Sequence, residues 1–180
     1  MAVTYCVIGA SGSGKSTSLG EVKELGLIGL DPKETAIINV MDKPLPFRGS
    51  RKDYGKRLSE GGNYAATSDA DTIVQILAHI NDNRPDIKNV VIDDYQYIMS
   101  EEFMAKAHKK GYDKFNEIAK HAYSVISYGR NMRDDINFIC LTHSELDDKA
   151  GSYKLKTIGK MLDDKVTLEG LFTVVLYTLV

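Results

Sequence analysis

The chain has few of the features that mark secreted, membrane or disulfide-stabilised proteins. It contains two cysteines, Cys6 and Cys140, which are too few for a disulfide framework and both lie in apolar, strand-like runs. We therefore expect both thiols to be reduced and buried as packing residues. No run approaches the roughly 18 apolar residues that cross a membrane, and no signal peptide precedes the first expected strand. These observations predict a cytoplasmic protein without a membrane segment.

The chain also lacks a strong charge of either sign and any internal repeat. Its formal net charge is −2, with 23 lysines and arginines against 25 acidic residues. Such a balance gives no general attraction to nucleic acid, so contact with DNA would need a local basic patch. A length of 180 residues suits one α/β domain. The apolar run at residues 171–180 ends without a polar cap, so we expect residues 1–180 to be a single domain truncated at its C-terminus.

What the chain does have is a complete G-x-x-x-x-G-K-[ST] phosphate-binding loop, GASGSGKS, at residues 9–16. It follows a β-branched run at residues 3–8 and precedes a helix expected at residues 15–25. Glycines let the loop direct several N–H groups at one anion, and the first helical turn adds more. We expect Lys15 to bind the β- and γ-phosphates and the Ser16 hydroxyl to bind Mg²⁺. The residues expected to bind ATP are Gly9, Ala10, Ser11, Gly12, Ser13, Gly14, Lys15, Ser16 and Thr17.

Strand-like and helix-like segments alternate along the chain, which predicts an α/β fold with a mainly parallel sheet flanked by helices. Further strands are expected at residues 36–40, 89–92 and 137–141, and helices at residues 71–83, 100–110 and 114–132. Residues 41–69 form a long irregular stretch, which is typical of a functional or mobile segment. Residues 153–158 and 171–180 predict antiparallel hairpin strands at the C-terminal end.

Polar groups follow two of the expected strands. Asp93 and Asp94 end the strand at residues 89–92, where ligands of open α/β sheets bind. Since Mg²⁺ bound to phosphate needs one or two carboxylates, we expect Asp93 to join Ser16 as a metal ligand. Asp94 would polarise the attacking water, unless the pair merely starts a turn. Thr142 or His143 would contact the γ-phosphate or that water, unless His143 is satisfied by local hydrogen bonds.

Four segments together resemble the phage-encoded RecA-like ATPases of the AAA/ASCE class, which include single-strand annealing and recombination ATPases. They are residues 9–16, NVVIDDYQYIM at 89–99, FICLTHSE at 138–145 and KLKTIGKMLDDKVTLEGLFTVVLYT at 154–178. The resemblance implies Mg²⁺-dependent ATP hydrolysis in the host cytoplasm, on single-stranded DNA during phage recombination or replication. It also implies a RecA-type core in which the sensor strand, residues 137–141, lies between the phosphate-loop strand and the strand before Asp93. Cys6 and Cys140 would then be near neighbours.

The chain departs from the RecA pattern at the catalytic base. That family places a glutamate just after the second strand, where this chain offers only Asp42, one position off and one methylene shorter. Either Asp42 or Asp94 takes the role, or hydrolysis is slow. RecA-type proteins assemble head to tail into rings or filaments, and the adjacent protomer supplies a cation. The candidate here is Lys160, unless the lysines of this region are only the solvent face of a strand.

The basic patch most suited to single-stranded DNA lies in the irregular stretch. Its cations would follow phosphates while its aromatic rings stack on bases, although a solvated basic loop is the simpler alternative. The patch consists of Arg48, Arg51, Lys52, Lys56 and Arg57, interleaved with Tyr54 and Tyr64. A nucleoside or small-molecule kinase is the main alternative function, and a nucleotide-binding assembly module without turnover is a third. The chain has no Asn-Lys-x-Asp motif, which disfavours a GTPase.

Overall fold

The computed structural model describes residues 1–147, 151–158 and 166–178. Its strands are β1 (Val3–Gly9), β2 (Thr35–Asn39), β3 (Tyr64–Ala66), β4 (Asn89–Asp93), β5 (Asn137–Asp147), β6 (Ser152–Leu155) and β7 (Val174–Tyr177). Its α-helices are α1 (Ser50–Asp53), α2 (Ala70–Asn83), α3 (Gln96–Ala105) and α4 (Asp113–Arg130). Short 3₁₀ helices are η1 (Thr17–Leu19), η2 (Lys23–Leu25), η3 (Leu58–Glu60) and η4 (Leu168–Leu171).

The strands form a mainly parallel sheet in the order β3-β2-β4-β5-β1-β7, as the alternating pattern predicts. β5 lies between β1 and β4, which is the arrangement that the resemblance implies. Cys6 and Cys140 are register partners on β1 and β5, and burial raises the pKa of both thiols. The prediction that the two cysteines are buried neighbours is therefore confirmed.

Both strands predicted for the C-terminal hairpin form, but they do not pair with each other, so the predicted hairpin is wrong. β6 pairs antiparallel with β5, because β5 continues to Asp147 instead of ending near residue 141. β7 instead pairs parallel with β1, with Val174 opposite Tyr5. β7 thereby forms one edge of the sheet, where Leu176 and Tyr177 remain about half exposed.

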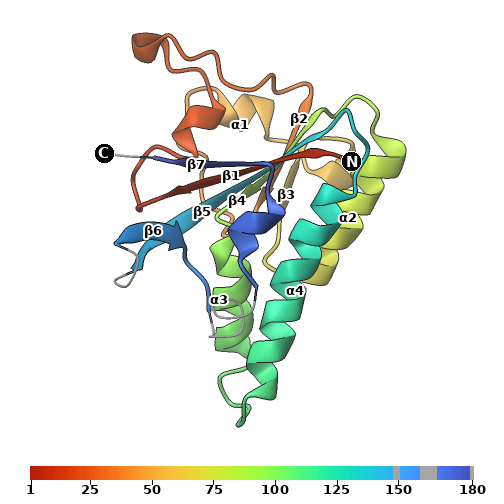
Figure 1. Cartoon of the computed structure of the whole chain (residues 1–180). Coiled ribbons are helices and arrows are strands. Elements are labelled where there is room, and N and C mark those ends of the chain that lie inside the picture. The colour runs from red at the N-terminus through yellow and green to blue at the C-terminus, as the bar shows by residue number, and fades with distance from the viewer. Residues whose placement is uncertain (148–150, 159–165, 179–180) are drawn as a thin grey trace.

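Helices α2, α3 and α4 cover one face of the sheet, while α1 and the segment around η1 lie on the other (Figure 1). The predicted helices at 71–83 and 114–132 are confirmed, because their apolar stripes pack on the main core. Asp69 caps α2 by accepting a hydrogen bond from the Thr72 N–H. The second face is covered by a smaller cluster that includes Leu19, Phe47 and Tyr54.

The helix expected at residues 15–25 does not form, and that prediction is wrong. Only the single turns η1 and η2 are present, separated by Gly20, which is extended at φ −100° and ψ 175°. The Ser18 hydroxyl donates to the Lys15 carbonyl at 2.7 Å, so a local side-chain bond competes with helical pairing. A Cβ at residue 20 would lie 2.4 Å from the Phe47 ring, which shows how closely this backbone approaches the sheet-covering cluster.

Two further boundaries differ from expectation. The irregular stretch contains α1, η3 and β3, and β3 joins the sheet edge beside β2. α3 begins at Gln96 and ends at Ala105, earlier than the predicted residues 100–110. Its start is fixed by Tyr95, whose N–H donates to the Leu141 carbonyl at 2.9 Å and whose hydroxyl donates to the Ala122 carbonyl at 2.7 Å.

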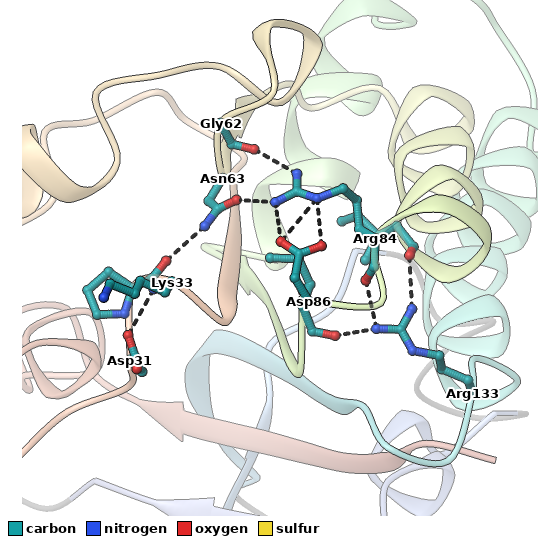
Figure 2. A network of polar contacts seen from close by, with 10 residues as sticks. Asp31, Lys33, Gly62, Asn63, Arg84, Asp86 and Arg133 are labelled. Carbon is teal, nitrogen blue, oxygen red and sulfur yellow. Dashed lines mark hydrogen bonds and ion pairs between the residues drawn. The ribbon is translucent and has the colours of Figure 1, made fainter.

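At the amino ends of the parallel strands, two arginines join the loops (Figure 2). Arg84 donates to the Gly62 carbonyl, to the Asn63 side chain and to Asp86. Arg133 donates to the carbonyls of Arg84 and Ile87, among others. These contacts tie together the segments before β3, β4 and β5. The loops that carry the candidate site lie at the opposite ends of the strands, which are the carboxyl ends.

None of the helices within the described ranges is long and apolar enough to cross a membrane.

Candidate functional site

The phosphate-binding loop and polar residues from three other segments line one cavity at the carboxyl ends of the strands. The cavity has a volume of about 220 Å³. Its lining consists of Ser11, Gly12, Ser13, Gly14, Lys15, Ser16, Thr17, Lys43, Pro46, Asp94 and His143. The structure thus brings the loop together with Asp94 and His143, which the sequence indicates separately, because β5 pairs with β1 on one side and with β4 on the other.

The loop needs its glycines for two different reasons. Gly12 and Gly14 have φ values of +77° and +85°, in the left-handed region that disfavours other residues. At Gly9 the reason is space, because a Cβ there would lie 1.8 Å from Thr178 Oγ1 and 2.6 Å from Ser13 Oγ. The hydroxyls of Ser13 and Thr178 are themselves hydrogen-bonded at 2.6 Å. The end of β7 therefore supports the loop, a contact that local sequence does not reveal.

Lys15 lies deep in the loop and is only 5% exposed. Its ammonium donates to the carbonyls of Gly9 and Ala10 at 2.9 and 2.8 Å. Burial lowers the pKa of Lys15, while the charges of Asp94 and Asp93 act in the opposite direction. The side chain is thus a cation placed against its own loop, where a phosphate would be a stronger partner than two neutral carbonyls.

Ser16 and Asp93 meet directly, although 77 residues separate them in the chain. The Ser16 hydroxyl donates to Asp93 Oδ1 at 2.8 Å, and Asp93 is 5% exposed. Burial raises the pKa of Asp93, and the hydrogen bond from Ser16 opposes that rise. A hydroxyl and a carboxylate are the hard oxygen donors that Mg²⁺ takes together with phosphate oxygens and water, so these two residues fit a phosphate-bound Mg²⁺.

Asp94 is held in an unusual backbone conformation between two partners. Its φ is +66°, which is uncommon for a residue with a side chain. His143 Nε2 lies 3.4 Å from Asp94 Oδ1, and Lys43 Nζ donates to Asp94 Oδ2 at 3.0 Å. The hydrogen bond with His143 lowers the pKa of Asp94, burial opposes this, and Lys43 lowers the pKa further. Asp94 is therefore a carboxylate at neutral pH and is a weak base.

Lys43 is a site residue that the sequence-based prediction misses. Its side chain lines the cavity, contacts Asp94 and lies over the Tyr97 ring, 4.8 Å from the ring centroid. His143 packs edge-on against the same ring at 5.8 Å. The only indication of Lys43 in the sequence is its position just after the second strand, next to Asp42. Because a catalytic base is expected there, only acidic residues are considered at that position, and the lysine is therefore missed.

Asp42 lies beside the cavity but its carboxylate is engaged elsewhere. It accepts a hydrogen bond from the Tyr64 hydroxyl at 2.9 Å, and Arg57 Nη2 lies 3.5 Å from its other oxygen. Asp42 lines a neighbouring pocket and is absent from the lining of the phosphate-loop cavity. Of the two candidate bases, Asp94 is the one that lines the phosphate-loop cavity.

Thr142 and Lys160 are two other candidate site residues predicted from the sequence. Thr142 is fully buried, and its hydroxyl has no hydrogen-bond partner among the described residues, so His143 is the group of this pair that reaches the cavity. Lys160 lies outside the described residues, as does the glycine before it.

The basic patch is only partly arranged as expected. Arg51 and Arg57 line a pocket of about 310 Å³ together with Tyr64, Asp42 and Lys43. The Arg57 guanidinium lies over the Tyr64 ring, 4.8 Å from its centroid. Tyr54 is buried and packs edge-on against Phe47 at 6.0 Å. Tyr54 also lines this pocket, but most of its ring packs in the smaller core, so Tyr64 is the more accessible of the two tyrosines.

No protein-family model matches the chain, and no curated protein matches it.

Proposed function

We propose that this protein binds ATP with Mg²⁺ and hydrolyses it. The observation that carries the proposal is the 2.8 Å hydrogen bond from Ser16 to Asp93, which joins the phosphate loop to a strand-terminal carboxylate. In P-loop proteins the hydroxyl of the loop and such a carboxylate serve the same metal ion. Ser16 and Asp93 lie beside the buried Lys15 and a loop in which Gly12 and Gly14 adopt left-handed backbone angles.

Each residue has a physical role in this proposal. Lys15 and the loop N–H groups bind the phosphates, and Ser16 and Asp93 hold Mg²⁺, which supplies positive charge to the triphosphate. Asp94 accepts a hydrogen bond from the attacking water and orients it, a role that a weak base can fill because phosphoryl transfer needs positioning more than proton abstraction. The water oxygen bonds to the γ-phosphorus as the bridging oxygen leaves with ADP, and the water proton passes to the released phosphate.

Within P-loop proteins, we propose a RecA-like ATPase. The support is the position of β5 between β1 and β4, together with His143, which lies within β5 and lines the cavity. From there His143 would respond to loss of the γ-phosphate and pass the change to the β5–β6 hairpin. This assignment agrees with the resemblance of the four sequence segments to RecA-like ATPases. Whether the protein assembles into a ring or a filament is a question for experiment.

We further propose that single-stranded DNA is the macromolecular substrate. The specific observation is the pocket that Arg51, Arg57 and Tyr64 line next to the phosphate-loop cavity, with Lys43 in both linings. Cations beside a partly exposed aromatic ring suit phosphates and a stacked base. A kinase acting on a nucleoside would use the same neighbouring pocket for its acceptor, and so is the alternative to be tested.

The nucleotide site is tested by Lys15→Ala. Loss of its charge-assisted contacts should lower ATP affinity by roughly 10- to 100-fold while the circular dichroism spectrum is retained. Isothermal titration calorimetry with ATP and Mg²⁺ measures the effect, and Lys120→Ala, an exposed lysine on α4, is the control that loses the same charge elsewhere. Unchanged affinity in Lys15→Ala would reject the site.

The reaction is tested by measuring phosphate release with and without single-stranded DNA, and phosphate transfer to nucleosides. Hydrolysis that DNA stimulates supports the proposed ATPase. Transfer to a nucleoside would identify a kinase instead, and binding without turnover an assembly module.

A further inference from the structure

Lys43 occupies a prepared position. Its carbonyl accepts a hydrogen bond from the Asn39 side chain at 2.7 Å, and Asn39 is 2% exposed. Asn39 is also the register partner of Asp93 across β2 and β4. The backbone of Lys43 is therefore fixed relative to the strand that carries the proposed metal ligand.

The ammonium of Lys43 is held less firmly than its backbone. Its side chain is 55% exposed and contacts Asp94 and the face of Tyr97. An ion pair with this exposure contributes little to stability, so the four-carbon side chain can exchange Asp94 for a more highly charged partner at small cost. The cavity beside it is the one lined by Lys15 and Ser16.

We propose that Lys43 is a catalytic residue that binds the γ-phosphate in its own subunit, and that its departure from Asp94 frees that carboxylate to orient water. The inference rests on the proposed ATPase function. Among the described residues lining the cavity, the lysine and arginine side chains are Lys15 and Lys43. A terminal phosphate offers Lys43 more charge and more acceptor oxygens than one carboxylate oxygen does. The same movement would thus neutralise the γ-phosphate and free Asp94.

The chemical step keeps the balance given above. The water oxygen bonds to the γ-phosphorus, the bond to the bridging oxygen breaks, and the electron pair stays on ADP. Lys43 remains protonated throughout, because it acts by charge and transfers no proton. It becomes the partner of the released phosphate, and it returns to Asp94 when that phosphate leaves.

The test compares affinities for ADP and for the non-hydrolysable β,γ-imido analogue of ATP, both with Mg²⁺, by calorimetry. We expect Lys43→Met to bind the analogue roughly 10- to 100-fold more weakly while its ADP affinity stays within about twofold, because only the analogue carries a γ-phosphate. Turnover should fall by a similar factor. Lys43→Arg should retain most of the preference for the triphosphate, and Lys120→Met should behave as wild type.

The outcomes separate this inference from the proposed function. Equal losses for ADP and the analogue in Lys43→Met, or no loss for either, would overturn the role of Lys43 while leaving the nucleotide site intact. Failure of Lys15→Ala to weaken either nucleotide would overturn the site itself. Thermal melting of each variant shows whether a loss of binding comes from loss of the fold.

Discussion

Asp93 and Asp94 are adjacent carboxylates with opposite electrostatic environments. Burial raises the pKa of Asp93, whereas the contacts with His143 and Lys43 lower that of Asp94. For Asp93 the ionised form is therefore disfavoured in the folded state. For Asp94 the ionised form is favoured there. The fold thus loses stability through one carboxylate, which is the proposed metal ligand, and gains it through the other.

These environments predict that two similar substitutions change stability in opposite directions. At pH 7 and without nucleotide, Asp93→Asn should raise the melting temperature and Asp94→Asn should lower it, each by roughly 2–4 °C. A raised folded-state pKa costs stability as pH rises from the unfolded value near 4 through the folded value. A lowered folded-state pKa adds stability at pH values above the unfolded pKa near 4. That stability is lost as the pH falls from the unfolded pKa through the folded pKa.

Melting curves recorded between pH 3 and pH 7 measure both effects. Toward the acid end the difference between Asp93→Asn and wild type should disappear, because Asp93 is protonated there in both states. The difference between Asp94→Asn and wild type should shrink as the pH falls, because the lowered pKa of Asp94 delays its protonation in the folded state. In the same preparation, Asp93→Asn should lose Mg²⁺-dependent nucleotide binding and Asp94→Asn should retain it. Equal destabilisation of both variants at pH 7 would contradict the assigned environments.

At the scale of elements, the segment from β2 to β3 contributes side chains to both of the neighbouring cavities. It carries Lys43 toward the phosphate-loop cavity, and it carries Arg51, Arg57 and Tyr64 toward the adjacent pocket. Its middle is anchored by Phe47 and Tyr54 in the smaller core. One segment with a packed centre therefore presents cations to two neighbouring cavities.

We predict that this segment binds single-stranded DNA through its cations. Replacing Arg51, Lys52, Lys56 and Arg57 with glutamine should weaken binding and reduce the slope of log affinity against log salt by about 0.7 for each phosphate that is no longer neutralised. Fluorescence anisotropy with a labelled oligonucleotide at several salt concentrations measures both quantities. The charge-matched control replaces four lysines near α4, namely Lys109, Lys110, Lys114 and Lys120.

If the slope fell as much in the control variant as in the loop variant, binding would depend on total charge and the loop would be merely solvated. An unchanged slope in the loop variant alone would lead to the same conclusion. Retained ATP affinity in both variants is required for the comparison, because the loop residues lie in the neighbouring pocket.

At the scale of the whole molecule, the open question is which catalytic groups come from one subunit. Lys15 and Lys43 line a single cavity in one chain. Lys160, which lies outside the described residues, is the sequence-based candidate for a cation supplied by an adjacent subunit. In a head-to-tail assembly, groups from one subunit and groups shared between subunits respond differently when variants are mixed.

Mixing inactive variants distinguishes the two arrangements. Lys15→Ala mixed with Lys160→Ala should recover part of the ATPase activity, because some interfaces pair an intact loop with an intact lysine; a cation in trans is worth roughly 10³- to 10⁵-fold in the Ras case. Lys15→Ala mixed with Lys43→Met should recover none, because both groups serve the same nucleotide. The assay is phosphate release, with assembly of each mixture checked by light scattering.

Recovery in the second mixture would place the action of Lys43 across an interface. Absence of recovery in the first, with both variants assembling, would remove Lys160 from the trans role.

Features that depend on residues close together in the chain are predictable from the sequence alone. The glycines and Lys15 of the phosphate loop and the apolar stripes of α2 and α4 follow from short-range spacing, and the structure has each of these features where the sequence predicts it. The contact between Ser16 and Asp93 is also predictable, because both are fixed positions of paired motifs at the ends of parallel strands.

Features that depend on packing between distant segments are set by the tertiary structure. Lys43 follows β2, Asp94 follows β4 and His143 lies within β5. They meet because β2, β4 and β5 are neighbours in the sheet. The same holds for Tyr54, which has the chemistry of a stacking residue but fills a core that its own segment completes. Local sequence propensity does not predict these contacts, because the burial and the partners of a side chain depend on which distant segments pack against it.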